Sequence, residues 1–182
     1  VATQGVLTFS GAQGIGKTTW FTRLAPSELD VILIGHTLDT KNKDSVFLAV
    51  SHWLVELGEL DATMRKSDIA ALKAFVTQQE DKLRRPYMAS ESEFVRRTSF
   101  CATVNDHDFL HDHSGNRRFW TIPVTSFGLD DSLDMQQLWA EVYTLYQAGE
   151  AHYLSQEESA ELSTHNENFT VADPIEERLA GA

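Results

Sequence analysis

Cysteine and long apolar runs are scarce in this sequence, and each scarcity excludes a class of protein. The one cysteine among the 182 residues, Cys101, leaves no partner for an internal disulfide and too few thiols for a cysteine-based zinc site. No run of about 18 apolar residues is present. A secretory signal consists of a charged segment followed by an apolar one, and the sequence shows no such pair of segments. We therefore expect a cytoplasmic protein with no membrane partner.

Basic residues are scarce in the last part of the chain. Residues 119–182 carry one base and twelve acids, whereas residues 65–118 carry ten bases and eight acids. The formal charge of −12 excludes a chain that binds nucleic acid over its whole surface. Paired basic residues nevertheless suit phosphate recognition. Four such pairs lie in the middle segment: Arg65-Lys66, Arg84-Arg85, Arg96-Arg97 and Arg117-Arg118.

Apolar residues make up 42% of the chain and charged residues 23%, which is the composition of a globular protein. Short β-prone runs alternate with amphipathic stretches, and this alternation favours an α/β layered fold with a largely parallel sheet. The expected strands are 6–9, 31–34, 53–56, 98–104 and 119–124. The expected helices are 18–24, 44–50, 67–76, 133–146 and one that starts after Ser155, and residues 80–97 are expected to form a hairpin or an extended loop.

The strongest motif is the glycine-rich segment after the first predicted strand. Residues 11–18 match the pattern G-x-x-x-x-G-K-[ST] at every fixed position, with a strand expected before them and a helix after them. Glycines let the backbone curl so that N–H groups point at phosphate oxygens. Lys17 reaches the β- and γ-phosphates and the Thr18 hydroxyl binds Mg²⁺. The predicted nucleotide-binding residues are Gly11, Ala12, Gln13, Gly14, Ile15, Gly16, Lys17, Thr18 and Thr19.

Hydrolysis of a nucleotide needs further groups downstream of this loop. Glu56 ends an apolar run and Glu59 follows three residues later, so either is a candidate for the acid that holds the Mg²⁺ shell and polarises water. Asn105 ends another apolar run, where it could position the attacking water. Arg117 or Arg118, which precede a predicted strand, could meet the charge that builds on the γ-phosphate, often from an adjacent subunit.

Several separated segments together resemble the virulence-associated protein E family. They are residues 56–60 (ELGEL), 72–75 (LKAF), 81–87 (DKLRRPY), 103–105 (TVN), 109–112 (FLHD), 115–120 (GNRRFW) and 173–177 (DPIEE). That family is similar to superfamily 3 helicases and to the primase-helicases of phages and mobile elements. The usual acid motif of these proteins has two adjacent acids, whereas here Leu57 follows Glu56.

The resemblance implies a fold and an activity. The implied fold is a P-loop NTPase three-layer sandwich, similar to AAA+ proteins, with strand order 5-1-4-3-2. The implied activity is that of an ATP-hydrolysing, helicase-like enzyme that uses ATP and Mg²⁺, acts on single-stranded or forked DNA, and assembles as a homo-oligomeric ring, commonly a hexamer.

The resemblance also implies roles for single residues. Glu56, with or without Glu59, would be the acid motif, Asn105 the sensor, and Arg117 or Arg118 the arginine finger. The segment that holds Lys82, Arg84 and Arg85 would carry a DNA-tracking hairpin.

We expect one domain over residues 1–182, with a nucleotide-binding core over 1–130 and an acidic helical segment over 131–182. The start at Val1 suggests a piece of a longer protein. In the predicted helix 133–146, four apolar residues share one face and are expected to point inward. They are Leu138, Val142, Leu145 and Tyr146. Ser155 and Glu158 have the spacing of a capping box.

Two other functions fit the phosphate loop alone. One is a nucleotide-dependent regulatory or binding module without motor activity, which would bind ATP and turn it over slowly whether or not DNA is present. The other is a small-molecule kinase, which needs an acceptor pocket and a lid that the sequence does not reveal. Stimulation of ATP hydrolysis by DNA separates the helicase-like hypothesis from both.

Overall fold

The structure is a computed structural model that describes residues 4–58, 60, 66–83, 92–105, 107–110, 115–128 and 134–171. The elements before the central hairpin are β1 (Val6–Ser10), α1 (Lys17–Thr22), η1 (Ser27–Leu29), β2 (Ile32–His36), α2 (Lys43–Val50), β3 (Leu54–Leu57) and α3 (Lys66–Val76). The later ones are β4 (Glu80–Leu83), β5 (Ser92–Val95), β6 (Ser99–Val104), η2 (Asn116–Arg118), β7 (Phe119–Pro123), α4 (Met135–Gln147) and α5 (Gln156–Glu167).

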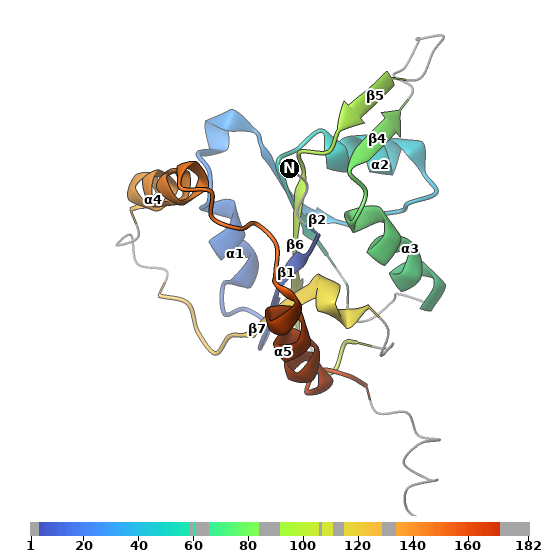
Figure 1. The fold of residues 1–182 in the computed structure, drawn as a ribbon, viewed down its shortest axis with the longest axis vertical. Coiled ribbons are helices and arrows are strands. Elements are labelled where there is room, and N and C mark those ends of the chain that lie inside the picture. Colours follow the sequence, from blue (N-terminus) through green and yellow to red (C-terminus); the bar gives the residue numbers. More distant parts are fainter. Residues whose placement is uncertain are drawn as a thin grey trace, which may run out of the picture.

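Five strands form a parallel sheet in the order β2-β3-β6-β1-β7 (Figure 1). Numbered within this sheet alone and read from β7, they run 5-1-4-3-2. Strand β1 lies between β6 and β7, with Val6 opposite both Phe100 and Phe119. The α/β class and the largely parallel sheet that the sequence predicts are therefore confirmed, and each predicted strand of the sheet is present.

Helices cover both faces of the sheet, because its strands are apolar on both sides. Figure 1 shows α1 on one face and α2 and α3 on the other. The α1 face packs Phe9, Phe21 and Cys101 together. The opposite face holds the larger cluster, in which strand residues meet residues of α2 and α3. Its members include Val6, Val55, Leu57, Phe100, Ala102, Val104, Ala49, Leu72, Phe75 and Val76.

The segment 80–97 forms a hairpin, as one of the two predicted alternatives stated. Strands β4 and β5 pair antiparallel in a separate two-stranded sheet that leads into the amino end of β6. Figure 1 shows the hairpin beside α2, beyond the end of the main sheet.

Arg96, at the base of this hairpin, is 1% exposed. Its Nε and Nη2 donate to both carboxylate oxygens of Asp81. Its Nη1 donates to the Phe75 carbonyl, 3.2 Å away, and its guanidinium lies 4.3 Å from the Phe75 ring centre. Arg96 therefore joins the hairpin to α3.

This burial corrects one interpretation of the basic pairs. Arg96 is an internal cation with an acidic partner, so it does not offer its charge to a phosphate, whereas its neighbour Arg97 is exposed. A pattern of adjacent arginines does not distinguish these two cases, because alternation along an extended segment sends neighbouring side chains to opposite sides.

Helix α4 is present where the sequence predicts it, but the prediction that its apolar face points inward is wrong. Val142, Leu145 and Tyr146 are 43%, 45% and 74% exposed, and α4 has no buried residue. The helix lies beyond α1, and Trp139 Nε1 donates to the Leu24 carbonyl at 2.6 Å (Figure 1). The apolar period correctly indicates an amphipathic helix. It does not state which surface covers that face.

Helix α5 begins with the predicted capping box. The Ser155 hydroxyl accepts from the Glu158 N–H at 3.2 Å, and the Glu158 carboxylate accepts from the Ser155 N–H at 2.7 Å. The hydrogen bond from the Ser155 N–H lowers the pKa of the Glu158 carboxyl group, and the Ser155 side chain adds to this effect. In the part of the chain that the structure describes, no helix has the length and apolar character needed to cross a bilayer.

Arg96→Ala is expected to destabilise the protein by about 3–5 kcal/mol, because it leaves the buried Asp81 carboxylate without its counter-ion. Arg97→Ala is the matched control, since Arg97 is exposed, and should change stability by less than about 0.5 kcal/mol. Urea unfolding of both variants measures the difference. Equal stabilities for the two variants would contradict the role assigned to the Arg96–Asp81 pair.

Candidate functional site

The glycine-rich loop follows β1 at the carboxyl end of the sheet. Gly11 donates its N–H to the Val104 carbonyl at 3.2 Å, and a Cβ at Gly11 would lie 2.1 Å from the Val124 carbonyl oxygen. Only glycine fits this contact. Gly14 and Gly16 have φ values of +83° and +98°, which favour glycine because a Cβ is strained there. The loop therefore curls between β1 and the first turn of α1.

Lys17 is the first residue of α1 and is 5% exposed. Its Nζ donates to the carbonyls of Gly11 and Ala12, at 2.5 and 2.8 Å, and to Asn105 Oδ1 at 3.1 Å. The structure thus brings together two residues that the sequence separates by 88 positions. Of the other loop residues, Thr18 is half-buried in the first turn of α1, and Gln13 and Thr19 are exposed.

Glu56 lies in β3 and is 2% exposed. Its Oε2 accepts from the Gly35 N–H and its Oε1 accepts from the Thr103 hydroxyl, both at 2.7 Å. Two neutral donors on neighbouring strands therefore fix the position of the carboxylate. Glu56 is paired in register with Cys101, whose side chain belongs to the cluster under α1. Register partners share a face of the sheet, so Glu56 lies on the face that α1 covers.

A register shift in β2 supplies one of these two donors. The pairing of β2 with β3 is regular at Leu33 and resumes at His36, and Gly35 between them has a φ of +67°. A bulge releases a backbone N–H from the ladder, and the N–H of Gly35 binds Glu56 instead. On the other neighbouring strand, burial and the nearby Glu56 carboxylate raise the pKa of the Cys101 thiol.

The second glutamate candidate, Glu59, lies outside the described residues, as do Arg84 and Arg85 of the hairpin. Lys82 is described and lies on β4, where its Nζ is 3.0 Å from a carboxylate oxygen of Glu93 on β5. Lys82 lowers the pKa of Glu93, chiefly by this hydrogen bond. The pair is exposed, so it adds little to stability.

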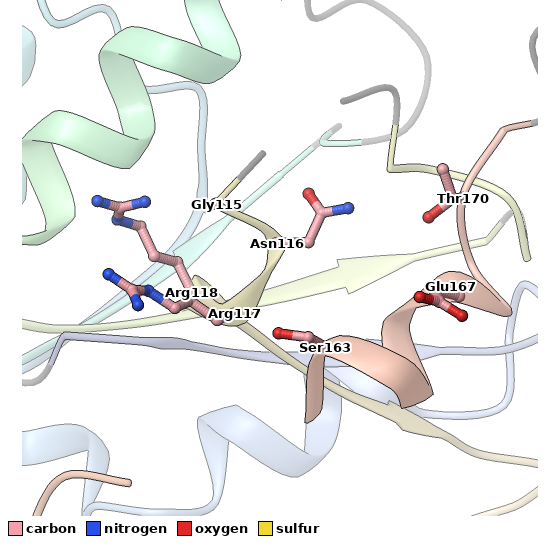
Figure 2. A pocket seen from close by; sticks show the side chains of 7 residues that line it. All are labelled: Gly115, Asn116, Arg117, Arg118, Ser163, Glu167 and Thr170. Atoms are coloured by element: carbon pink, nitrogen blue, oxygen red, sulfur yellow. The ribbon is translucent and has the colours of Figure 1, made fainter. Parts of the chain in front are cut away.

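Arg117 and Arg118 lie in the η2 turn that precedes β7. Figure 2 shows both side chains on one side of the turn, with Glu167 of α5 on the other side of the cavity. Arg117 is exposed and Arg118 is half-buried. Among the described residues, the buried Nε of Arg118 has no hydrogen-bond partner. The turn and the region of α5 together line a cavity of about 400 Å³. The lining residues are Gly115, Asn116, Arg117, Arg118, Ser163, Glu167 and Thr170.

A buried polar network holds this arginine turn in place. The Nδ2 of Asn166, a fully buried residue of α5, donates to the carbonyls of Asn116 and Phe119 at 2.8 and 2.9 Å. Lys73 of α3, which is also buried, donates from Nζ to Asn116 Oδ1 at 3.3 Å. Gly115 starts the turn with a φ of +72°. Helices α3 and α5 thus set the direction in which the two arginines leave the fold.

The sheet register separates the arginines from the glycine-rich loop of the same chain. The loop follows Ser10, which pairs with Pro123, whereas Arg118 directly precedes Phe119, which pairs with Val6. The loop and the arginines therefore lie at opposite edges of the sheet: the loop at the edge formed by the carboxyl ends of the strands, and the arginines at the edge formed by the amino ends. The five residues of β1 between them span about 16 Å at the usual rise per residue. Lys17, Asn105 and Glu56 gather at the carboxyl edge, and the arginine pair does not join them.

The residues that position the site were not among the predicted ones. Gly35, Thr103, Lys73 and Asn166 act through contacts between elements that are 21 to 50 positions apart in the chain. One signal was available: Gly35 follows an apolar run, and such a glycine indicates a bulge or close backbone contact. A threonine in a strand or a lysine in an amphipathic helix carries no comparable signal.

The chain belongs to the virulence-associated protein E-like domain family, whose model matches residues 1–171. This confirms the resemblance inferred from the sequence motifs. No curated protein matches the chain.

Solved structures of the NrS-1 C-terminal region are similar in fold. One apo structure of this region, the A form, superposes with a TM-score of 0.51 at 17% identity, covering 96% of this chain and 41% of that one. A second apo structure, of residues 305–718, has a TM-score of 0.49 at 20% identity, covering 94% and 41%. The chain thus spans less than half the length of these structures.

Asn166→Ala should destabilise the protein by about 1–3 kcal/mol, because it leaves two buried carbonyl groups without a donor. Asn168→Ala is the control: Asn168 Nδ2 caps the same helix from an exposed position, at 3.1 Å from the His165 carbonyl. Denaturant unfolding of the two variants tests the assignment. A stability loss no larger for Asn166→Ala than for Asn168→Ala would show that Asn166 does not hold the arginine turn.

Proposed function

We propose that the chain is an ATP-hydrolysing P-loop domain of the helicase-like type, with the three-layer sandwich and 5-1-4-3-2 strand order of superfamily 3 helicases and AAA+ proteins. The observation that carries this proposal is the convergence of three side chains at the carboxyl ends of β1, β6 and β3. Lys17 contacts Asn105 directly, and Glu56 is held by Thr103 of the same strand that leads to Asn105. Ligands of open α/β sheets bind at this edge.

The donor set at this edge suits a nucleoside triphosphate with Mg²⁺. The loop offers the ammonium group of Lys17 and backbone N–H groups, which are the groups that bind phosphate oxygens. The positive φ values of Gly14 and Gly16 let the backbone curl around a phosphate. Mg²⁺ in such sites takes one hydroxyl and one acid from the protein, and its other ligands are phosphates and water. Thr18 would supply the hydroxyl and Glu56 the acid. When bound, the metal would neutralise charge on the β- and γ-phosphates.

Each residue of the site then has a separate task. Residues 11–19 would bind the phosphates, and Lys17 would exchange its contacts with the loop carbonyls for phosphate oxygens. Asn105 would orient the attacking water, since it stands next to the lysine that marks the γ-phosphate position. Glu56, or Glu59, would accept a proton from that water. The buried position of Glu56 favours it, because water-excluded charges act more strongly on a reacting group.

The arginine pair would serve a neighbouring copy of the chain. Arg117 and Arg118 lie at the opposite edge of the sheet from the loop of their own chain, so neither reaches the γ-phosphate there. A head-to-tail contact would place them at the carboxyl edge of the next copy. Such heterologous contacts form a ring when the rotation between successive copies closes. We therefore propose a homo-oligomeric ring, of which the hexamer is the expected form.

DNA is the proposed partner of this ring, in the replication of a phage or mobile element. The hairpin formed by β4 and β5 projects from the fold and is braced at its base by the Arg96–Asp81 pair. Lys82 on its first strand, followed by Arg84 and Arg85, would contact the phosphates of single-stranded or forked DNA. Family membership supports this proposal.

One observation favours the alternative, a nucleotide-dependent regulatory module without motor activity. The described strands of the hairpin carry three acids, Glu80, Asp81 and Glu93, and Lys82 is already paired with one of them. These strands therefore do not form a basic surface. In this alternative the chain binds and slowly hydrolyses ATP, and DNA has no effect on the rate.

Single-stranded or forked DNA is expected to raise the ATPase rate of the chain, and Lys17→Ala should abolish hydrolysis with and without DNA because the phosphates lose their main cation. Lys41→Ala, which removes an exposed lysine outside the loop, is the control. A phosphate-release assay with thermal melts of each variant measures both effects. Normal hydrolysis by Lys17→Ala would refute the site, and a rate unchanged by DNA would favour the regulatory module.

A mixing experiment tests the arginines. The double variant Arg117→Ala with Arg118→Ala and the variant Lys17→Ala should each be inactive alone. Mixtures of the two should recover part of the activity, because some interfaces then combine an intact loop with intact arginines. Single arginine variants, mixed in the same way, identify which guanidinium is needed. No recovery at any ratio would contradict a finger that acts between subunits.

A further inference from the structure

We propose that Thr103 is a positioning residue for hydrolysis, because it orients the Glu56 carboxylate and links it to the Lys17–Asn105 contact. The inference rests on the proposed ATPase function and adds a residue that has no assigned role. Thr103 lies on β6, the strand between the loop strand β1 and the acid strand β3. Its hydroxyl donates to Glu56 Oε1 at 2.7 Å.

The Glu56 carboxylate keeps acceptor positions beyond those that its two donors use. An ionised carboxylate has about four acceptor positions on its two oxygens. Thr103 occupies one position on Oε1, and the Gly35 N–H occupies one on Oε2. One lone pair on each oxygen is therefore left for a water or for a metal-bound water. The two donors set the plane of the carboxylate, and this plane determines where those lone pairs point.

The two donors to Glu56 differ in kind. The Gly35 N–H belongs to the backbone of the β2 bulge, so its position follows from the strand. The Thr103 hydroxyl is a side-chain group on the strand that leads to the sensor candidate Asn105, two residues before it. Residues i and i+2 of a strand share a face. Strand β6 thus presents Thr103 to Glu56 and Asn105 to Lys17 on a common face.

The position of β6 therefore affects the acid and the lysine together. A shift of β6 relative to β3 or β1 would change the Glu56 contact and the Lys17 contact together. Thr103 therefore makes the direction of the acid depend on the position of the strand that ends at the sensor. Its hydroxyl would not contact the nucleotide. It acts through Glu56, in the way that hydrogen-bond partners orient the ligands of a metal site.

Thr103→Val and Thr103→Ser test this role. Valine keeps the β-branched shape and removes the hydroxyl, whereas serine keeps the hydroxyl. We expect Thr103→Val to lower kcat about 10- to 100-fold, the usual cost of losing such an orienting partner. The KM for ATP should change little, because the phosphate loop is intact. Thr103→Ser should retain most of the wild-type kcat.

Thr98→Val is the matched control. Thr98 lies beside the amino end of the same strand, is buried, and donates its hydroxyl to the His52 carbonyl at 2.7 Å. Both valine variants lose one hydroxyl bond near β6, so thermal melts should show comparable losses of stability. Only Thr103→Val should lose kcat. Equal kcat values for the two valine variants, or a Thr103→Ser variant as slow as Thr103→Val, would overturn the proposal.

A second measurement separates this proposal from the ATPase proposal itself. Binding of a fluorescent ATP analogue is titrated with Mg²⁺, and Thr103→Val should need about tenfold more Mg²⁺ than the wild type for half-saturation. If the wild type hydrolyses no more ATP than Lys17→Ala, the proposed function fails while this titration still reports on Thr103. An unchanged Mg²⁺ requirement in Thr103→Val would overturn the positioning role in that case as well.

Discussion

The pairing of β1 with a parallel strand on each side is the constraint on which the rest of the structure depends. It places the glycine-rich loop, which follows Ser10, beside the end of β6, where Asn105 meets Lys17. The same pairing aligns Val6 with Phe119, so the arginine turn before β7 lies at the other edge. Hydrogen bonds continue past the strand, from Gly11 to Val104 and from Val124 to Ser10, and they join the entrance of the loop to the neighbouring strands. In the neighbouring pair of β3 and β6, a slip of one residue would turn Thr103 to the face of the sheet opposite Glu56.

The second constraint is electrostatic and lies in the hairpin. A guanidinium buried between Phe75 and Phe100 is costly to desolvate. The two-point contact with Asp81 and the hydrogen bond from Nη1 to the Phe75 carbonyl offset that cost. Arg96 therefore fixes the angle at which β4 and β5 leave the fold, because its partners come from β4 and from the end of α3. A lysine would not reproduce this arrangement, since it lacks the planar fork.

Local patterns predicted the elements well, and long-range contacts explain what they missed. The loop of residues 11–18, the strand positions and the Ser155–Glu158 capping box depend on neighbours within a few residues, so spacing alone reveals them. The pairing of Glu56 with Thr103 joins residues 47 positions apart and follows only from the order of the strands. Arg96 and Arg97 are chemically identical, and only packing distinguishes the buried one from the exposed one. The apolar face of α4 is exposed, which its sequence does not predict because amphipathicity does not identify the covering surface.

The separation of charge along the chain takes on a meaning once the register is known. Glu56 and Lys17 share the carboxyl edge, while the arginine pair lies at the opposite edge, held by α3 and α5. A chain that used all of these groups on one nucleotide would have to bend its own sheet, which close packing forbids. In the proposed ring, two copies placed head to tail would bring the arginines of one copy to the loop of the next without a change in either fold. The net charge of −12 is therefore compatible with phosphate chemistry, because recognition depends on where the few cations point and not on the average.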